Sequence, residues 1–224
     1  MSPPVLHFAP GTCARVPLIA LEEIGGPFET RLVAFMAGEH RTPEFLARNP
    51  AGKVPLLEID GEVLAQNAAI LTYLARRHPK SYLLPYTGEP LADAQLLARL
   101  AWFSADLHPL VTRIRMPQFF CDLEGGPDRV RELGCGGMAF QLAPLERALG
   151  EAPWVLGAAW SLLDAYLFWV WFRIAGAGFD VVPFPNIVSH YRRMQVRPAV
   201  QRALAREEEA QVELVSRGFT VPLA

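Results

Sequence analysis

The chain has 224 residues, of which 51% are hydrophobic and 20% are charged, and its net charge at pH 7 is −2. This composition provides enough apolar side chains to bury a sizeable core in one large domain or in two small ones. Because the basic residues are scattered and the net charge is slightly negative, the sequence lacks the positive surface with which proteins bind nucleic acids. We therefore expect a globular protein that has no nucleic-acid partner.

The N-terminal sequence and the cysteines predict a cytoplasmic protein. The chain does not open with a basic segment followed by a long apolar run, so a secretory signal is not expected. The most apolar stretch, residues 165–182, contains Arg173 and two glycines, whereas a membrane span needs about 20 clean apolar residues, so we expect a buried helix there. Three cysteines without Cys-x-x-Cys spacing favour a reducing compartment, and no metal-ligand spacing stands out.

Residues 1–77 alternate between short strand patterns and helix patterns. The expected strands cover residues 5–8, 28–33, 55–59 and 63–65, and the expected helices cover residues 15–24, 42–46 and 66–77. Asp60-Gly61 separates the last two strands and is a hairpin signal. This order of strands and helices predicts one small α/β domain.

The rest of the chain carries a linker pattern and then helix patterns. Residues 78–90 contain three prolines and a glycine, which is typical of a linker. Strand alternation is absent after this segment, and helical stretches are expected at residues 91–120, 128–149, 162–175, 185–194 and 198–208. Within the first of them, Pro109 and Pro117 are expected to kink or end the helix. Ser161 and Asp164 have the spacing of a helix capping box. Residues 91–224 are therefore expected to form an all-helical domain.

Two places in the first domain have backbone features suited to a ligand. Pro55 opens a strand after a turn, so the Val54–Pro55 bond is either cis, which leaves the Val54 N–H and C=O available, or an ordinary trans bond on an edge strand. Gln66-Asn67 opens a helix, where backbone N–H groups and the helix dipole favour a ligand carboxylate. The alternative for Asn67 is an ordinary helix cap.

Two side chains are candidates for chemistry at a sulfur atom. Cys13 lies at the start of the first expected helix, where the thiolate is favoured, although a lone cysteine is often a small buried apolar residue. His108 lies in the long helical stretch and would make a hydrogen bond in a cleft between the domains. Its alternative is a partly exposed histidine beside the kink expected at Pro109.

Taken together, these segments resemble the glutathione S-transferase family. Residues 49–57 resemble that family's loop leading to a cis-proline, and residues 64–74 resemble its glutathione-binding turn and helix. Residues 161–168 resemble its helix-initiating box, and residues 197–200 resemble its closing Arg-Pro segment. The segments at residues 9–14 and 100–109 are most similar to the bacterial beta class, in which the cysteine faces glutathione and the histidine reaches its sulfur. The resemblance implies a thioredoxin-like N-terminal domain, an all-helical C-terminal domain and a homodimer.

The resemblance also implies how glutathione would lie along the first domain. Its cysteinyl backbone would pair with Val54, which precedes the expected cis-proline Pro55, in the manner of strand addition. Its γ-glutamyl carboxylate would accept donors at Asn67, its ammonium would face Gln66, and its glycyl carboxylate would lie near Lys53. No metal is implied, and glutathione serves as the co-substrate.

The glutathione thiol would lie near Cys13 and His108 and would attack a small hydrophobic electrophile. The expected electrophile pocket is formed by aromatic residues of the second domain, which otherwise belong to its core: Trp102, Phe103, Phe119 and Phe120. This interpretation predicts a detoxifying transferase.

Two departures from the family pattern leave alternatives open. Many relatives have Ser or Gly where this chain has Asn67, and Arg15 replaces a small or apolar residue, where it would pair with the ligand or favour the Cys13 thiolate. One alternative function is a glutathione-dependent thiol–disulfide oxidoreductase that uses Cys13. The other is a binding protein that keeps the fold without turnover.

Overall fold

The computed structural model describes residues 3–219, which form two compact units. The first unit contains the residues up to Leu83 together with the described residues from Val196 onward, and the second contains residues 84–195. The division thus differs from the sequence-based one at the C-terminal helix, which belongs with the first unit.

The first unit is built on a four-stranded mixed sheet. Its strands are β1 (Val5–Phe8), β2 (Glu29–Leu32), β3 (Leu56–Ile59) and β4 (Glu62–Ala65), in the order β2-β1-β3-β4. β1 pairs in parallel with β2 and antiparallel with β3, and β3 and β4 form the predicted hairpin. Together with its helices, this sheet gives the thioredoxin-like arrangement that the sequence predicted.

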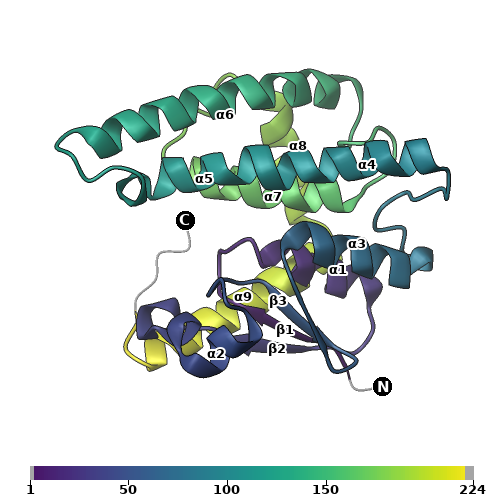
Figure 1. The fold of residues 1–224 in the computed structure, drawn as a ribbon. Helices are drawn as coiled ribbons and strands as arrows, with labels where there is room; N and C mark the ends of the chain where they lie inside the picture. Colours follow the sequence, from purple (N-terminus) through teal and green to yellow (C-terminus); the bar gives the residue numbers. More distant parts are fainter. Residues whose placement is uncertain (1–2, 220–224) are drawn as a thin grey trace. The chain divides into compact units, whose positions relative to one another are not determined.

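Helices pack on both faces of this sheet. They are α1 (Arg15–Ile24), α2 (Pro43–Arg48), α3 (Asn67–Arg77) and α9 (Pro198–Ser216). α1 and α3 lie against each other on one side of the sheet (Figure 1). Phe45 of α2 contacts His7, whose side chain lies on the opposite face from those of Leu6 and Phe8 because strand residues alternate.

α9 packs along α1 through ion pairs as well as apolar contacts. The Arg15 guanidinium donates to the Glu207 carboxylate, and both side chains are 2% exposed. Glu22 of α1 accepts from Arg202 and Arg206 of α9 at 2.6 Å each. These contacts explain why α9 belongs with the first unit. The sequence alone placed α9 in the all-helical domain because its hydrophobic pattern is that of a helix.

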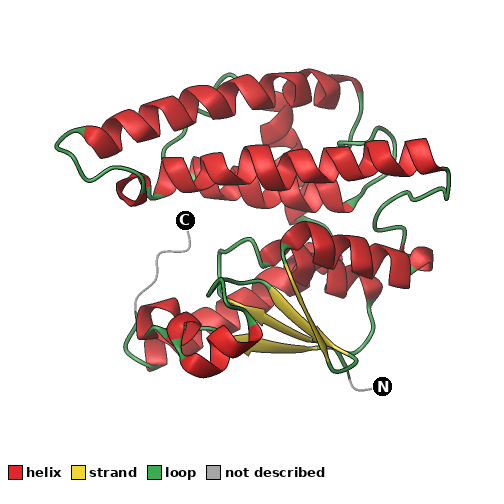
Figure 2. Cartoon of the chain, in the orientation of Figure 1, coloured by secondary structure: helices red, strands yellow, loops and turns green. Residues whose placement is uncertain are grey.

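The second unit is helical throughout, as the sequence predicted (Figure 2). Its helices are α4 (Pro90–Trp102), α5 (His108–Arg115), α6 (Gly126–Glu151), α7 (Leu162–Ala175) and α8 (Pro185–Gln195). The predicted capping box is confirmed, because the Ser161 hydroxyl accepts from Leu163 N and the Asp164 carboxylate accepts from Ser161 N. Within residues 3–219, no helix has the length and apolar character needed to cross a bilayer.

The helical stretch expected over residues 91–120 is irregular next to Pro109 and ends just before Pro117, the two prolines expected to kink or end it. A π-helical turn occupies Phe103–Leu107 between α4 and α5, and a short 3₁₀ turn begins at Pro117. Pro109 lacks a backbone N–H, and it lies in the first turn of α5, where that loss is tolerated. The π-helical turn joins α4 to α5 without a break in the helical backbone, and His108 is the first residue after it.

The buried histidine of β1 makes the stability of the first unit depend on pH. His7 is 3% exposed, and its Nε2 lies 2.9 Å from a carboxylate oxygen of Glu58, which also accepts from Arg48. Desolvation lowers the pKa of His7 below 6.5, and the contact with Glu58 opposes the shift only in part. Because the folded state binds this proton less readily than the unfolded chain does, the free energy of unfolding decreases as the pH falls below 6.5.

We expect urea denaturation to show this decrease between about pH 7 and about pH 5.5, at no more than about 1.4 kcal/mol per pH unit for one histidine. The variant His7→Gln keeps a donor for Glu58 but does not titrate, so it is expected to lose most of the pH dependence that His7 causes. An equal loss of stability in both proteins would show that His7 is not the responsible group.

Candidate functional site

Cys13 lies in a tight turn between β1 and α1. Thr12 fixes this turn, because its hydroxyl donates to Ala9 O at 2.7 Å and accepts from Ala14 N at 3.4 Å. The Cys13 side chain is partly exposed, and its Sγ donates to Val54 O at 3.6 Å. The thiol therefore lies just before the N-terminus of α1 and touches the residue that precedes Pro55.

The Val54–Pro55 peptide bond is cis, which is the first of the two alternatives left open by the sequence. Val54 precedes β3, whose pairing with its neighbours begins at Leu56, so the described sheet does not use the Val54 backbone. Asn49 holds the preceding turn, because its side-chain amide donates to Lys53 O at 2.6 Å. The Lys53 side chain is exposed.

The start of α3 differs in one respect from the sequence-based expectation. Gln66 precedes the helix with a φ of 73° and an exposed side chain, and Asn67 is the first helical residue. The side-chain amide of Asn67 is buried and donates to Cys13 O at 3.0 Å. This amide is therefore neither the expected helix cap nor a donor directed at a ligand carboxylate. The first backbone N–H groups of α3 remain suited to an anion.

Cys13 is the residue at which these segments meet. Its carbonyl oxygen accepts from Asn67 of α3, and its thiol contacts Val54 beside β3. Cys13 is thus in contact with two motifs of the same unit that lie 41 and 54 positions further along the chain. The arrangement combines a thiol, a backbone segment outside the sheet and a helix N-terminus, and these suit a short peptide with a carboxylate and a sulfur atom.

Arg15 makes an ion pair that its position in the sequence did not suggest. Its guanidinium is buried and donates to Glu207 at 2.5–3.1 Å, so its charge is compensated inside the unit. No local sequence signal points to this partner, because the two residues lie 192 positions apart. Arg15 therefore supports the packing of α1 against α9.

His108 belongs to the second unit, where two aromatic residues hold its ring. Its Nδ1 lies 3.0 Å from the Tyr166 hydroxyl, and the ring centroids of His108 and Trp169 are 4.5 Å apart in an edge arrangement. Tyr166 is fully buried and stacks on Phe103 with centroids 5.5 Å apart. Tyr166 lies in the segment that follows the capping box, and no motif in the sequence assigned it a role of its own.

The four aromatic residues expected to form one electrophile pocket do not share one environment. Trp102 and Phe103 line a cavity of about 300 Å³ beside α6, and Phe103 itself is fully buried in the core. Phe119 and Phe120 lie beyond the end of α5 and are 68% and 47% exposed. These two pairs are therefore separate features of the second unit.

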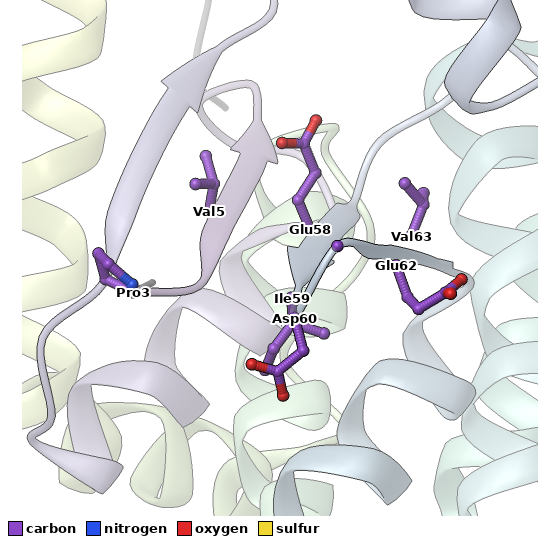
Figure 3. A pocket seen from close by; sticks show the side chains of 8 residues that line it. Pro3, Val5, Glu58, Ile59, Asp60, Glu62 and Val63 are labelled. Carbon is purple, nitrogen blue, oxygen red and sulfur yellow. The ribbon is translucent and has the colours of Figure 1, made fainter. Parts of the chain in front are cut away.

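A shallow hollow of about 190 Å³ lies at the β3–β4 turn (Figure 3). The hollow is lined by Val5 and by Ile59, the last residue of β3, whereas Val54 lies just before the first residue of β3. The hollow and Val54 therefore lie at opposite ends of the sheet. The carboxylates of Glu58, Asp60 and Glu62 surround it, so it is poorly suited to a ligand with carboxylates of its own. Across residues 3–219, no group of three or more His, Cys, Asp or Glu side chains is placed to hold a metal ion.

Sequence comparison assigns the chain to a family. Residues 4–76 match the model of the glutathione S-transferase N-terminal domain. Glutathione S-transferase GST-4.5 of Xanthomonas campestris pv. campestris is 30% identical over 202 residues, which cover 90% of this chain and 98% of that protein. Maleylacetoacetate isomerase of Pseudomonas aeruginosa is 35% identical over 131 residues, which cover 58% of this chain and only 60% of that protein.

Solved structures show the same likeness over almost the whole chain. A glutathione transferase homologue from Sulfitobacter with bound glutathione superimposes with a TM-score of 0.81 at 28% identity, covering 92% of this chain and 99% of that one. The beta-class glutathione S-transferase of Sphingomonas chungbukensis gives a TM-score of 0.78 at 31% identity, covering 91% and 98%. The chain belongs to the glutathione S-transferase family, which confirms the predicted fold class and the resemblance read from the motifs.

Proposed function

We propose that the first unit binds glutathione and that the protein transfers the glutathione thiolate to small hydrophobic electrophiles. The observation that carries this proposal is the meeting of Cys13 with both Val54 and Asn67 in one unit. Family membership supports it, and so does the glutathione bound to the Sulfitobacter homologue.

The bound tripeptide would lie along the backbone around Val54. Because Val54 precedes the ladder of β3, its peptide groups are suited to pair with the cysteinyl residue of the ligand as an added strand would. The N-terminus of α3 receives the γ-glutamyl carboxylate, and the exposed side chain of Gln66 accepts from the ammonium. The exposed ammonium of Lys53 pairs with the glycyl carboxylate.

The chemistry requires the glutathione sulfur to be ionised. A free thiol has a pKa of about 8.5, so donors near the sulfur are needed to favour the thiolate at neutral pH. We assign this role to Cys13 and His108, the latter held by Tyr166. The thiolate forms a bond to an electrophilic carbon, and the leaving group departs with the electron pair of the bond that breaks.

A second candidate is reduction of mixed disulfides through Cys13. It is favoured by the contact of the Cys13 thiol with Val54 O, which would place this sulfur beside the cysteinyl part of the ligand. The Cys13 thiolate would attack the glutathione sulfur of a mixed disulfide and release the other thiol. A second glutathione would then reduce the resulting Cys13–glutathione disulfide, forming glutathione disulfide.

Three further expectations from the sequence stay predictions. They are a cytoplasmic location, a homodimer and a role in detoxification. A ligand that is itself a thiol fits a reducing compartment, and no disulfide joins any of the three cysteines within residues 3–219. Sedimentation of the purified protein measures the oligomeric state directly.

The proposed activity is tested by glutathione-affinity chromatography followed by conjugation of 1-chloro-2,4-dinitrobenzene. We expect retention on the column and formation of the conjugate with release of chloride. Retention without conjugation would favour the binding protein that lacks turnover. Turnover of maleylacetoacetate but not of the chloro compound would instead favour an isomerase like the relative of that name. A chain that passes through unretained would contradict glutathione binding.

A further inference from the structure

The side chain of Asn67 is directed into the protein rather than toward a ligand. Asn67 is 5% exposed, and its Nδ2 donates to Cys13 O at 3.0 Å. Its Oδ1 is also buried and has no hydrogen-bond partner among residues 3–219. A buried acceptor that makes no hydrogen bond lowers stability, so the contribution of this side chain comes from the bond that its amide donates.

Helix capping does not account for this residue. The N-cap position of α3 is held by Gln66 and not by Asn67, and no side-chain cap is formed there within the described residues. The single bond from Asn67 instead joins α3 to a residue 54 positions earlier in the chain. What it holds in place is therefore the turn that carries Cys13.

The Cys13 turn is held from a second direction by its own thiol. Cys13 Sγ donates to Val54 O at 3.6 Å, so the residue is anchored through its carbonyl to α3 and through its side chain to the segment before β3. The second contact exists only while the thiol keeps its proton, so the geometry of the turn affects how readily that proton is lost.

We propose that Asn67 is a positioning residue for Cys13. Its amide fixes the Cys13 carbonyl and thereby keeps the thiol against Val54 O, while the ligand carboxylate is bound by backbone N–H groups of α3. The proposal rests on the proposed function only in taking glutathione as the ligand beside Cys13. It assigns Asn67 a role in setting thiol reactivity, not in ligand affinity.

The test measures thiol reactivity and ligand affinity separately. In a chain with Cys121→Ser and Cys135→Ser, Cys13 is the one remaining thiol, and its alkylation by iodoacetamide is followed by mass spectrometry from about pH 5 to about pH 9. The variants are Asn67→Ala and Asn67→Ser, whose shorter side chains do not reach Cys13 O. The control is Ala69→Ser at an exposed position of α3.

We expect alkylation at neutral pH to become about fivefold faster in both Asn67 variants, which is the effect expected from the loss of one hydrogen bond. The midpoint of the pH profile of alkylation is expected to move to lower pH. Their glutathione affinity, measured by calorimetry, is expected to change less than about threefold. Unchanged or slower alkylation would overturn the proposal, as would a tenfold loss of affinity with an unmoved profile. If the parent chain does not bind glutathione, the proposed function fails, and the alkylation profile still decides the role of Asn67.

Discussion

Glu207→Ala is expected to destabilise the first unit by about 3–5 kcal/mol, because it leaves the buried Arg15 guanidinium without its counter-charge. Both side chains are 2% exposed, so water does not replace the lost partner. The guanidinium makes three hydrogen bonds to Glu207, and all of them disappear in the variant. Urea denaturation followed by circular dichroism measures the change.

The matched control removes both charges together. In the double variant Arg15→Met and Glu207→Leu, apolar side chains of similar size fill the site, and most of the lost stability is expected to return. If the single and the double variants were equally unstable, the damage would come from lost packing between α1 and α9 and not from an unpaired charge.

Cys13→Ser is expected to abolish the reduction of glutathione mixed disulfides and to slow conjugation by about tenfold to a hundredfold. Disulfide reduction requires the sulfur of Cys13 as the attacking atom, whereas conjugation uses the sulfur of glutathione and needs Cys13 only as a donor beside it. The serine hydroxyl still donates, which preserves part of the conjugating activity. Steady-state rates with a mixed disulfide and with a chloro-dinitrobenzene measure both effects.

Cys135→Ser is the appropriate control for this experiment. Burial raises the pKa of the Cys135 thiol, so Cys135 is expected to be a poor nucleophile and its replacement to leave both rates nearly unchanged. Full retention of disulfide reduction in Cys13→Ser would contradict the role assigned to Cys13.

Local signals in the sequence were sufficient for most of the fold. The first helix and the helix after the capping box begin and end where predicted, at Arg15–Ile24 and Leu162–Ala175, because glycines and the Ser161–Asp164 box mark their ends. The stretch predicted as helical over residues 91–120, with kinks or ends at Pro109 and Pro117, runs through α4, a π-helical turn and α5 and ends at Arg115, just before Pro117. A π-helical turn depends on how neighbouring helices pack, and hydrophobic periodicity does not report it.

The partners of the site residues were harder to predict than the residues themselves. The motifs identified Cys13 and Asn67, but not that the Asn67 amide donates to the Cys13 carbonyl. They identified Arg15 as unusual, but not that it pairs with Glu207. Both contacts join segments that are distant in the chain, and a single sequence contains no signal for such pairs. The same reason explains why the sequence-based division did not place α9 with the first unit, as the contacts of the structure do.

Calorimetric titration of the intact protein with glutathione tests the glutathione site most directly, when combined with alkylation of Cys13. We expect saturable binding with a Kd at or below about 1 mM, within the usual range for enzyme substrates, and we expect bound glutathione to slow the reaction of Cys13 with iodoacetamide. The absence of binding heat together with unchanged Cys13 alkylation at saturating glutathione would contradict a glutathione site formed by Cys13, Val54 and the start of α3.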